Sequence, residues 1–590
     1  MAGIFHSTDP AAMETMAARF EGAGLTVTTV EIGGVRVGHA RADGALDDYV
    51  AVDEHGCGIV SSSRIGYQGH VGREALAAMY DDHLTGGVDR RTLVNDGVSV
   101  IASDREGYEI LTGVSGVPVL YWHAQGPTLT WASVLYFMAS TVPDLTLDPA
   151  AVVERALNYS LVGSDTIFNE IDILTSGAAA LVRHTGNGPL WTRRPADPLT
   201  PRSDVDGNEA AATIVKVATD QYRTLGCLYD GFTVYMTGGL DSRLQLALLL
   251  AADVDRDSID LVYGVGNSFM TNTKQRDLEI VRQIASGERL RFAELDWTAD
   301  GFDESGWDGI LELSGEEGLT YARGMPLGSQ RLTTAEVGQF VVFGYFGELL
   351  RPLDWQTAAM DGTMTLRGFV DRYLQFPTQG VNPAVLDEMR TRITGRFAQV
   401  LDRGPDERLT EPDVLRAYIE YRRSADTRAS RLRALRGASF PVLGHPEILE
   451  VLLGLSFEAK AGSRLLVDVT RRCAPELLSY QVFSHARTYE LSQDGSLQRP
   501  RKTLASSGVK DGLRAALPAG SRRGRLARDV YRGLRPGKTV AARPARLVEA
   551  VEGAQTRSGV AVLDPDVYQG DARGLIHVAQ QIRLFELSVR

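Results

Sequence analysis

The stretch VYMTGGLDSRLQLALLLAA, residues 234–252, constrains the fold more than any other part of the sequence. It begins with an apolar run typical of a buried strand, turns through two glycines and continues as a leucine-rich helix. Strands that alternate with helices in this way are typical of a parallel, doubly wound sheet. In such sheets ligands bind at the carboxyl ends of the strands, which is where this turn lies.

The turn carries groups that suit an anion. Gly238 and Gly239 allow the backbone to approach a phosphate group closely, while Thr237 and Ser242 supply hydroxyl groups. The helix that follows presents N–H groups and the positive end of its dipole. The turn therefore predicts a phosphate site, and a strand-turn-helix without a ligand is the alternative. It is not a Walker loop, which needs Gly-Lys-Ser/Thr.

Asp241 in the same turn points to a metal-bound nucleotide. A carboxylate repels bare phosphate groups, but Mg²⁺ between them turns the repulsion into coordination, because this ion is bound by one or two carboxylates together with phosphate oxygens. Arg243 follows two positions later. It either reaches a phosphate bidentately or pairs with an acidic residue of its own helix, and the sequence leaves both open.

Composition limits the class of protein. The chain has 590 residues, of which 44% are hydrophobic and 23% are charged, which is typical of a soluble protein with at least two domains. A net charge of −13 opposes binding to a phosphate backbone, so no nucleic-acid partner is expected. The basic segment 521–547 is the local exception, interpreted either as a solvated surface or flexible tail or as a contact with a partner or a polyanionic substrate.

Three features favour a cytoplasmic protein without a membrane partner. The cysteines Cys57, Cys227 and Cys473 form neither a metal-binding spacing nor a disulfide framework, which is typical of a reducing compartment. The N-terminal sequence lacks the basic start and apolar core of a signal peptide. No apolar run reaches the roughly 20 residues that a membrane helix needs.

The sequence divides into three regions. Residues 1–195 alternate short β-type runs with Gly and Asp turns, which favours stacked sheets. A Pro, Asp and Gly-rich linker, 193–212, ends in a helix cap, and the alternating strands and helices of a second domain follow over 205–505. Residues 506–590 are expected to form a basic linker and a C-terminal helical extension.

The sequence TGGLDSR, 237–243 with Leu240 at its centre, closely resembles the pyrophosphate-binding loop Ser-Gly-Gly-x-Asp-Ser of the asparagine synthetase superfamily. Further segments resemble that family in the same order. The stretch DREGYEILTGVSGVPVLYW looks like a strand hairpin of its glutaminase-type domain, and the stretch from LDPAAVVERALNYS to GAAALV looks like the approach to its synthetase domain. FVVFGYFGELLRP stands where its second magnesium motif lies, and FPVLGHPEILEVLLGLSFEAK looks like its late helical signature.

The resemblance implies an α/β fold in two parts. Residues 1–195 are expected to form a degenerate glutaminase domain, an αββα sandwich of the Ntn-hydrolase type. Residues 205–505 are expected to form a PP-loop ATP pyrophosphatase domain, which is similar to adenine nucleotide α-hydrolases and has a parallel sheet. Members of the family use ATP and Mg²⁺ to adenylate a carboxylate, and they release pyrophosphate.

The sequence departs from asparagine synthetase at its second residue. Glutaminases of the family carry a cysteine directly after the initiator methionine, and this chain has Ala2 there. Because amide hydrolysis needs an activatable thiol or hydroxyl, we expect no glutamine hydrolysis. An amine on the substrate, or on a second substrate, then becomes the nucleophile. This resembles the branch of β-lactam synthetases, carbapenam synthetases and lasso peptide cyclases.

The second magnesium motif points to the same branch. The lactam-forming enzymes read Gly-Tyr-Gly-x-Asp, and this chain reads Gly344-Tyr345-Phe346-Gly347-Glu348. The resemblance implies that Tyr345 is the base that deprotonates the attacking amine and that Glu348 joins Asp241 as a metal ligand. Phe346 replaces a glycine of the family. A tyrosine packed against its neighbours is the alternative for Tyr345.

The remaining candidates are carried over from the family more loosely. Asp426 or Glu420 stands where the partner carboxylate of the tyrosine is expected, although ion pairs along their own helix explain both equally well. The lysine that lactam-forming relatives carry after PELL is missing, and Arg487, His485 or Lys502 are the possible substitutes. Nucleotide contacts are also expected from Gly344 and from three residues around the second strand of the parallel sheet, namely Gly264, Gly266 and Asp277.

The sequence thus predicts a C–N bond-forming ligase that consumes ATP and releases AMP and pyrophosphate. Its substrate is expected to be a small-molecule or peptide carboxylate that meets an amine nucleophile, giving an amide or a lactam, and a homodimer is possible. Two alternatives remain: an ammonia-using amidase of a larger acid, and a degenerate ATP-binding regulatory protein.

Overall fold

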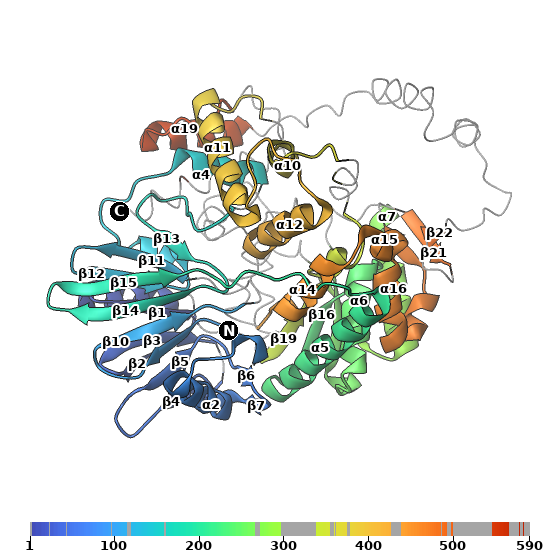
Figure 1. Cartoon of the computed structure of the whole chain (residues 1–590), viewed down its shortest axis with the longest axis horizontal. Helices are drawn as coiled ribbons and strands as arrows, with labels where there is room; N and C mark the ends of the chain where they lie inside the picture. Colours follow the sequence, from blue (N-terminus) through green and yellow to red (C-terminus); the bar gives the residue numbers. More distant parts are fainter. Residues whose placement is uncertain are drawn as a thin grey trace.

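The computed structural model of the chain describes residues 3–22, 24–42, 44–95, 97–114, 120–158, 161–265, 272–296, 338–353, 359, 362–374, 378–425, 438–484, 487–492, 497–498, 545–565, 578 and 582. It is an α/β structure, as the sequence predicts, with antiparallel sheets in its first part and a parallel sheet in its second (Figure 1).

The first part of the chain is built on two stacked antiparallel sheets. The first sheet has the order β13 (Asp172–Leu174), β11 (Leu120–Gln125), β12 (Thr128–Ala132), β1 (Gly3–Ser7), β3 (Val35–Arg41), β2 (Thr26–Ile32). The second sheet has the order β15 (Gly188–Arg194), β14 (Ala179–Thr185), β10 (Gly107–Leu111), β9 (Ser99–Ala102), β5 (Gly58–Ser61), β4 (Val50–Val52).

Side chains that alternate along these strands form the layers. Ile4, Val37 and Trp131 of the first sheet share one apolar cluster with Val100 and Ile110 of the second, so the inner faces of the two sheets pack together. The outer faces are covered by α1 (Pro10–Gly22) on the first sheet and α2 (Gly72–Thr85) on the second. The result is a helix–sheet–sheet–helix sandwich.

The second part contains a four-stranded parallel sheet of order β18 (Arg291–Asp296), β17 (Ile259–Val265), β16 (Gly231–Tyr235), β19 (Gln339–Val342). The alternation of helices and strands predicted from residue 205 onward is confirmed by α5 (Gly207–Leu228), β16, α6 (Leu240–Ala251), β17 and α7 (Asn272–Glu288). The Asp206 carboxylate accepts hydrogen bonds from the N–H groups of Asn208 and Glu209, so the linker ends in the expected helix cap.

The order of the parallel strands creates a switch point. The chain passes from β16 to β17 and β18 on one side, and then returns to place β19 on the other side of β16. Strands β16 and β19 are therefore neighbours in the sheet although β17 and β18 lie between them in the sequence. Such a point opens a crevice at the carboxyl ends of the two strands, where open α/β sheets bind ligands.

Helices from the later part of the chain pack against the first part. Met389 and Phe397 of α11 (Pro383–Leu401) share an apolar cluster with Val152 of α4 (Pro149–Asn158) and Val551 of α19 (Ala545–Ser558). Figure 1 shows these three helices gathered beside the sandwich. No helix of the described residues is long and apolar enough to cross a membrane.

The remaining elements are short or lie around these cores. They are α3 (Leu135–Ala139), α10 (Leu366–Tyr373), α12 (Glu411–Ala425), α14 (Pro446–Gly454), α15 (Phe457–Lys460), α16 (Arg464–Cys473), the sheet β7 (His70–Val71), β6 (Gly66–Tyr67), β8 (Leu93–Val94), the sheet β20 (Val482–Ser484), β21 (Arg487–Leu491), β22 (Leu497–Gln498), and the 3₁₀ turns η1 (Leu46–Asp48), η2 (Arg90–Thr92), η3 (Arg256–Ser258), η6 (Gly347–Leu350), η8 (Val442–Gly444), η9 (Ala461–Ser463) and η10 (Pro475–Ser479).

An ion pair connects the sandwich to the helices of the second part. The Arg91 guanidinium donates to both oxygens of Glu450 on α14, at 2.9 and 2.7 Å. Burial alone raises the pKa of the Glu450 carboxyl, but the hydrogen bonds from Arg91 and from the Thr200 N–H bring it below its ordinary value. The Arg91 carbonyl also lies 2.9 Å from Nε2 of His445.

We expect Arg91→Met to lower the free energy of unfolding by about 2 kcal/mol near neutral pH, because it removes two hydrogen bonds to a buried carboxylate. Because the pKa of Glu450 is lowered in the folded protein, this stabilisation is present above the ordinary carboxyl pKa. It is lost as the pH falls through the lowered value. Urea denaturation at neutral and acidic pH measures both effects.

The control is Arg367→Met, which breaks the exposed Arg367–Asp406 pair and should leave stability nearly unchanged. Two results would contradict a stabilising Arg91–Glu450 pair. One is an Arg91→Met protein as stable as the wild type at neutral pH, and the other is a stability difference between the two proteins that grows as the pH falls.

Candidate functional site

The turns that follow β16 and β19 meet at the switch point. A Cβ atom added to Gly347 would lie 2.8 Å from Cβ of Asp241, and one added to Gly344 would lie 3.1 Å from the Ser242 nitrogen. The two turns are therefore in direct contact, and only glycine fits at position 347 without movement of the neighbouring turn. The two motifs that the sequence singles out, 237–243 and 344–348, form one site.

The hydroxyl groups of the glycine turn bind within the turn itself. Ser242 Oγ accepts a hydrogen bond from the Thr237 N–H and donates to the Thr237 carbonyl, both at 3.1 Å. Thr237 Oγ1 lies 3.0 Å from Ser242 Oγ and accepts from the Gly239 N–H at 3.2 Å. Ser242 is buried and Thr237 is exposed. These bonds fix the shape of the turn, so Thr237 is the better placed of the two hydroxyl groups to meet a ligand.

Asp277 holds the glycine turn through a hydrogen bond to its backbone. Its buried carboxylate accepts the Gly238 N–H at 2.6 Å and the Tyr263 hydroxyl at 3.0 Å. Burial and the Asp277 charge raise the pKa of Tyr263, which keeps the hydroxyl protonated as a donor. A Cβ atom on Gly238 would lie 2.8 Å from Asp277 Oδ1, so position 238 needs glycine to admit this carboxylate. The Gly238 N–H is thus bonded within the protein, and the close approach of Gly238 to a phosphate stays a prediction.

Arg243 is buried beneath the site, with none of its surface exposed. Its Nη1 donates to the carbonyls of Leu477 and Tyr480 at 3.1 and 2.9 Å. Its Nη2 donates to the carbonyls of Gly238 and Gln481 at 3.2 and 2.7 Å. Burial lowers the pKa of Arg243 to about 10, which leaves it charged at neutral pH. Arg243 therefore fastens residues 477–481 to the glycine turn, a third role beside the two that the sequence leaves open.

The groups left at the mouth of the turn belong to the start of α6. This helix begins after Gly239 without a hydrogen bond from a capping side chain. The first turn of α6 is therefore the part of the predicted phosphate cradle that can face an anion, since the Gly239 N–H is bonded to Thr237 Oγ1.

Asp241 and Glu348 stand on the two adjoining turns. The Asp241 carboxylate is 29% exposed, and its Oδ2 accepts a hydrogen bond from Arg351 at 2.7 Å. Glu348 is half-buried, and its Oε1 lies 3.5 Å from the hydroxyl oxygen of Tyr418 on α12. Neither Arg351 nor Tyr418 was predicted from the sequence.

Tyr345 is half-buried and held through its backbone. Its carbonyl accepts from Gln245 Nε2 at 3.2 Å, and the buried Tyr222 hydroxyl donates to Gln245 Oε1 at 2.7 Å. The Tyr345 ring lies 5.1 Å from the ring of Phe343, measured between centroids. The packed arrangement that the sequence leaves as an alternative is thus present, and the role of Tyr345 as a base stays a prediction.

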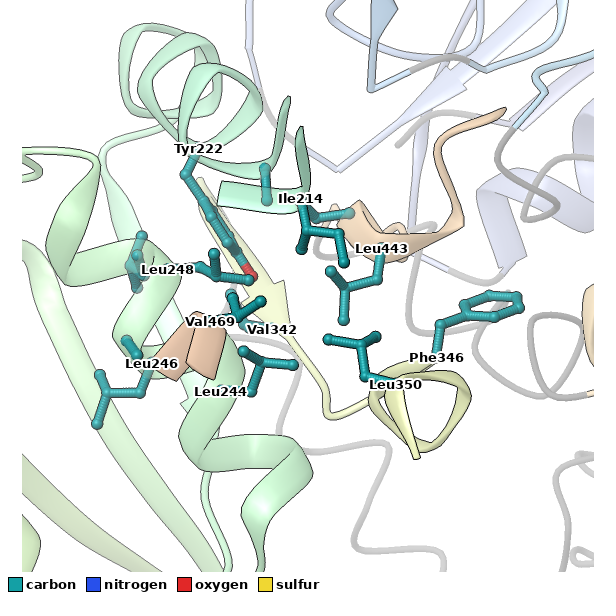
Figure 2. Packing of buried hydrophobic residues seen from close by; sticks show 14 of the residues in the cluster. Ile214, Tyr222, Leu244, Leu246, Leu248, Val342, Phe346, Leu350, Leu443 and Val469 are labelled. Carbon is teal, nitrogen blue, oxygen red and sulfur yellow. The ribbon is translucent and has the colours of Figure 1, made fainter. Parts of the chain in front are cut away.

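Phe346 keeps the backbone shape that glycine adopts readily. Its φ and ψ are 63° and 0°, in the left-handed region, and its side chain is 2% exposed. Figure 2 shows Phe346 and Leu350 projecting from the turn after β19 on the side of Leu443. The replacement of the expected glycine therefore adds an apolar anchor at the cost of backbone strain.

The other predicted site residues are only partly described. Gly264 lies near the carboxyl end of β17, beside β16. Glu420 is half-buried on α12, two positions after Tyr418, and residues two apart on a helix do not face the same way. Arg487 begins β21, but its side chain lies outside the description. The remaining predicted positions lie outside the described residues: Ala2, Gly266, Asp426, His485 and Lys502.

Asp241 and Glu348 suit a metal ion that takes its remaining ligands from a nucleotide. Among the described residues, no three His, Cys, Asp or Glu side chains come together as a set that could hold an ion alone. Mg²⁺ does not require such a set, because it retains waters and takes one or two carboxylates together with phosphate oxygens. Asp241 and Glu348 on adjoining turns fit that requirement.

No protein-family model matches the sequence, and no curated protein matches it. The assignment of the site therefore depends on its own residues.

We expect Phe346→Gly to be more stable than Phe346→Ala by about 1 kcal/mol, because glycine alone relieves the left-handed strain. Through the loss of a buried ring, Phe346→Ala should be about 3 kcal/mol less stable than the wild type and Phe346→Gly about 2 kcal/mol less stable. Denaturant unfolding measures the order. At Phe369, which is buried in the regular helix α10, the order should reverse. If the glycine variant were the more stable one at both positions, or the alanine variant at both, the backbone strain at Phe346 would be contradicted.

We also expect Arg243→Met to lower stability by about 3 kcal/mol, because it leaves buried carbonyl groups without their donor. Hydrogen exchange should become faster at residues 477–483 and in the glycine turn. The comparison Arg472→Met removes a partly exposed arginine that contacts Asp468 on α16 and Asn208 on α5, and it should leave hydrogen exchange at residues 477–483 unchanged. Unchanged exchange at 477–483 in Arg243→Met would show that Arg243 does not hold this segment.

Proposed function

We propose that the protein is an ATP- and Mg²⁺-dependent ligase that adenylates a carboxylate and joins it to an amine, with release of pyrophosphate and AMP. The observation that carries this proposal is the direct contact of the glycine turn with the turn after β19, which places Asp241 beside the Glu348 turn. A phosphate-suited turn and two carboxylates on adjoining turns are the parts that a magnesium-bound triphosphate needs.

The residues of the site would have three roles, which are to bind phosphates, to bind the metal ion and to fix the shape of the turn. The N–H groups at the start of α6 would hold phosphate oxygens, and Asp241 and Glu348 would hold the metal ion. Bound Mg²⁺ would neutralise the charge that develops on the pyrophosphate leaving group. Asp277 and Arg243 keep the turn in one shape, so that the N–H groups need little reorganisation when the nucleotide binds.

The capture of the activated carboxylate by an amine needs a base, because a protonated amine has no electron pair to donate. Tyr345 follows Gly344 in the turn that touches Ser242, and its backbone is fixed by Gln245. This position supports Tyr345 as that base, with Tyr418 as a second hydroxyl near Glu348.

The fold supports the same proposal at a coarser level. Two antiparallel sheets between helices are compatible with a degenerate glutaminase domain of the Ntn-hydrolase type. The parallel sheet with its glycine turn after β16 is compatible with a PP-loop ATP pyrophosphatase domain. The first domain would then brace the second, as the Arg91–Glu450 pair illustrates.

One observation favours the alternative of a nucleotide-binding regulatory protein. Asp277 already occupies the Gly238 N–H, and Arg351 already pairs with Asp241, so fewer groups remain for phosphates than the sequence suggests. A ligase should turn over ATP with release of pyrophosphate and AMP, whereas a regulatory protein should bind ATP without turnover.

The test is release of pyrophosphate and AMP by the purified protein with Mg-ATP. The conditions are aspartate with glutamine, aspartate with ammonia, and an extract of small molecules and peptides from the source cells. We expect release with the extract alone and none from Asp241→Ala. Release supported by glutamine would contradict the expected loss of glutaminase activity, and silence in every condition would favour the regulatory alternative.

We expect Tyr345→Phe to lower turnover by about 100-fold while nucleotide binding stays unchanged, since general-base catalysis contributes on that order. Steady-state pyrophosphate release and equilibrium ATP titration measure the two quantities. Tyr418→Phe, which removes the hydroxyl near Glu348, is the matched comparison. Full turnover in Tyr345→Phe would rule out Tyr345 as the base.

A further inference from the structure

The Arg351–Asp241 ion pair spans the two turns of the site. Arg351 follows η6 directly, and its Nη2 donates to Asp241 Oδ2 at 2.7 Å. The side chains are 35% and 29% exposed, so solutes reach both groups. Asp241 belongs to the turn after β16 and Arg351 to the turn after β19, so the pair bridges the switch point between these strands.

The position of the pair distinguishes it from an ordinary surface contact. Isolated exposed ion pairs contribute little to stability. Here the guanidinium is bonded to Asp241, one of the two predicted metal ligands, and Arg351 directly follows the 3₁₀ turn that carries the other, Glu348. Asp241 and Glu348 bring two negative charges to adjoining turns, and Arg351 offsets one of them.

A metal ion and Arg351 compete for the same oxygen. Mg²⁺ binds carboxylate oxygens directly at about 2.1 Å, and Oδ2 of Asp241 is bonded to Arg351. A divalent cation that binds this oxygen meets the positive charge of the guanidinium beside it, and this repulsion favours displacement of the guanidinium. The released side chain keeps its charge, since arginine stays protonated at neutral pH, and it remains tethered beside the start of α6. Its planar fork suits two phosphate oxygens.

We propose that Arg351 is the resident counter-cation of Asp241, that a divalent metal ion replaces it, and that its guanidinium then binds the phosphates of the nucleotide. The first step depends only on Asp241 and Arg351, whereas the second rests on the proposed function. Arg351 thus weakens metal binding in the free protein and strengthens nucleotide binding once the metal has entered.

The test measures Mn²⁺ binding without nucleotide by electron paramagnetic resonance, and then ATP binding with metal present by calorimetry. The proteins are the wild type, Arg351→Met, Arg351→Lys and Asp241→Asn. Arg367→Met is the matched control, because it breaks an exposed pair between Arg367 on α10 and Asp406. Arg351→Lys keeps a positive charge on a different side chain, and it serves as the second variant if Arg351→Met does not fold.

We expect Arg351→Met to bind Mn²⁺ about fivefold more tightly than the wild type, the effect of removing a competing ion pair. It should bind ATP about tenfold more weakly through the loss of a charged phosphate contact. The affinities of Arg351→Lys for Mn²⁺ and for ATP should lie between those of the wild type and of Arg351→Met. Asp241→Asn should abolish Mn²⁺ binding, and Arg367→Met should match the wild type.

Two results would overturn the proposal. Mn²⁺ affinity unchanged or undetectable in Arg351→Met would show that Arg351 does not compete for Asp241. If Arg351→Met bound Mn²⁺ more tightly but ATP with unchanged affinity, Arg351 would not bind the phosphates of the nucleotide. If the wild type bound no ATP while Arg351→Met still gained Mn²⁺ affinity, the proposed nucleotide function would fail while the competition at Asp241 stood.

Discussion

The site depends on the parallel pairing of β16 with β19. Phe232 and Val234 of β16 lie opposite Phe340 and Val342 of β19, although more than 100 residues of chain separate the two strands. Because both strands run the same way, their carboxyl ends finish together, and the turns that follow are forced into contact. The fit is close enough that position 347 excludes even a Cβ atom. Without this pairing, the glycine turn and the Tyr345 turn would be unrelated surface loops.

Buried polar groups hold the contact in one shape. Asp277 takes the Gly238 N–H from below, while Arg243 takes the Gly238 carbonyl and ties the turn to residues 477–481. A buried guanidinium is costly unless its hydrogens are bonded, and here its four Nη hydrogens find carbonyl partners. Apolar anchoring of Phe346 completes the arrangement. These bonds fix the backbone of the turn, so a ligand at the candidate site would require little rearrangement of it.

The sequence predicts the elements of this site better than its contacts. The strand, turn and helix over 231–251 are evident from local periodicity and from Gly238 and Gly239, and the structure confirms them. The partners of Arg243 are not evident, because three of them are carbonyl groups that lie 234 to 238 positions further along the chain. Arg351 was missed for a related reason, since its pair with Asp241 exists only through the strand order. On α12, helical spacing separates Tyr418 from Glu420, but only the structure shows that Tyr418 reaches Glu348.

The most direct measurement is an experimental structure of the protein with Mg²⁺ and the non-hydrolysable α,β-methylene analogue of ATP. The account predicts phosphate groups against the N–H groups at the start of α6 and an ion held by Asp241 and Glu348. It also predicts that the guanidinium of Arg351 has left Asp241. A nucleotide bound elsewhere, or an Asp241–Arg351 pair unchanged beside a bound nucleotide, would contradict it.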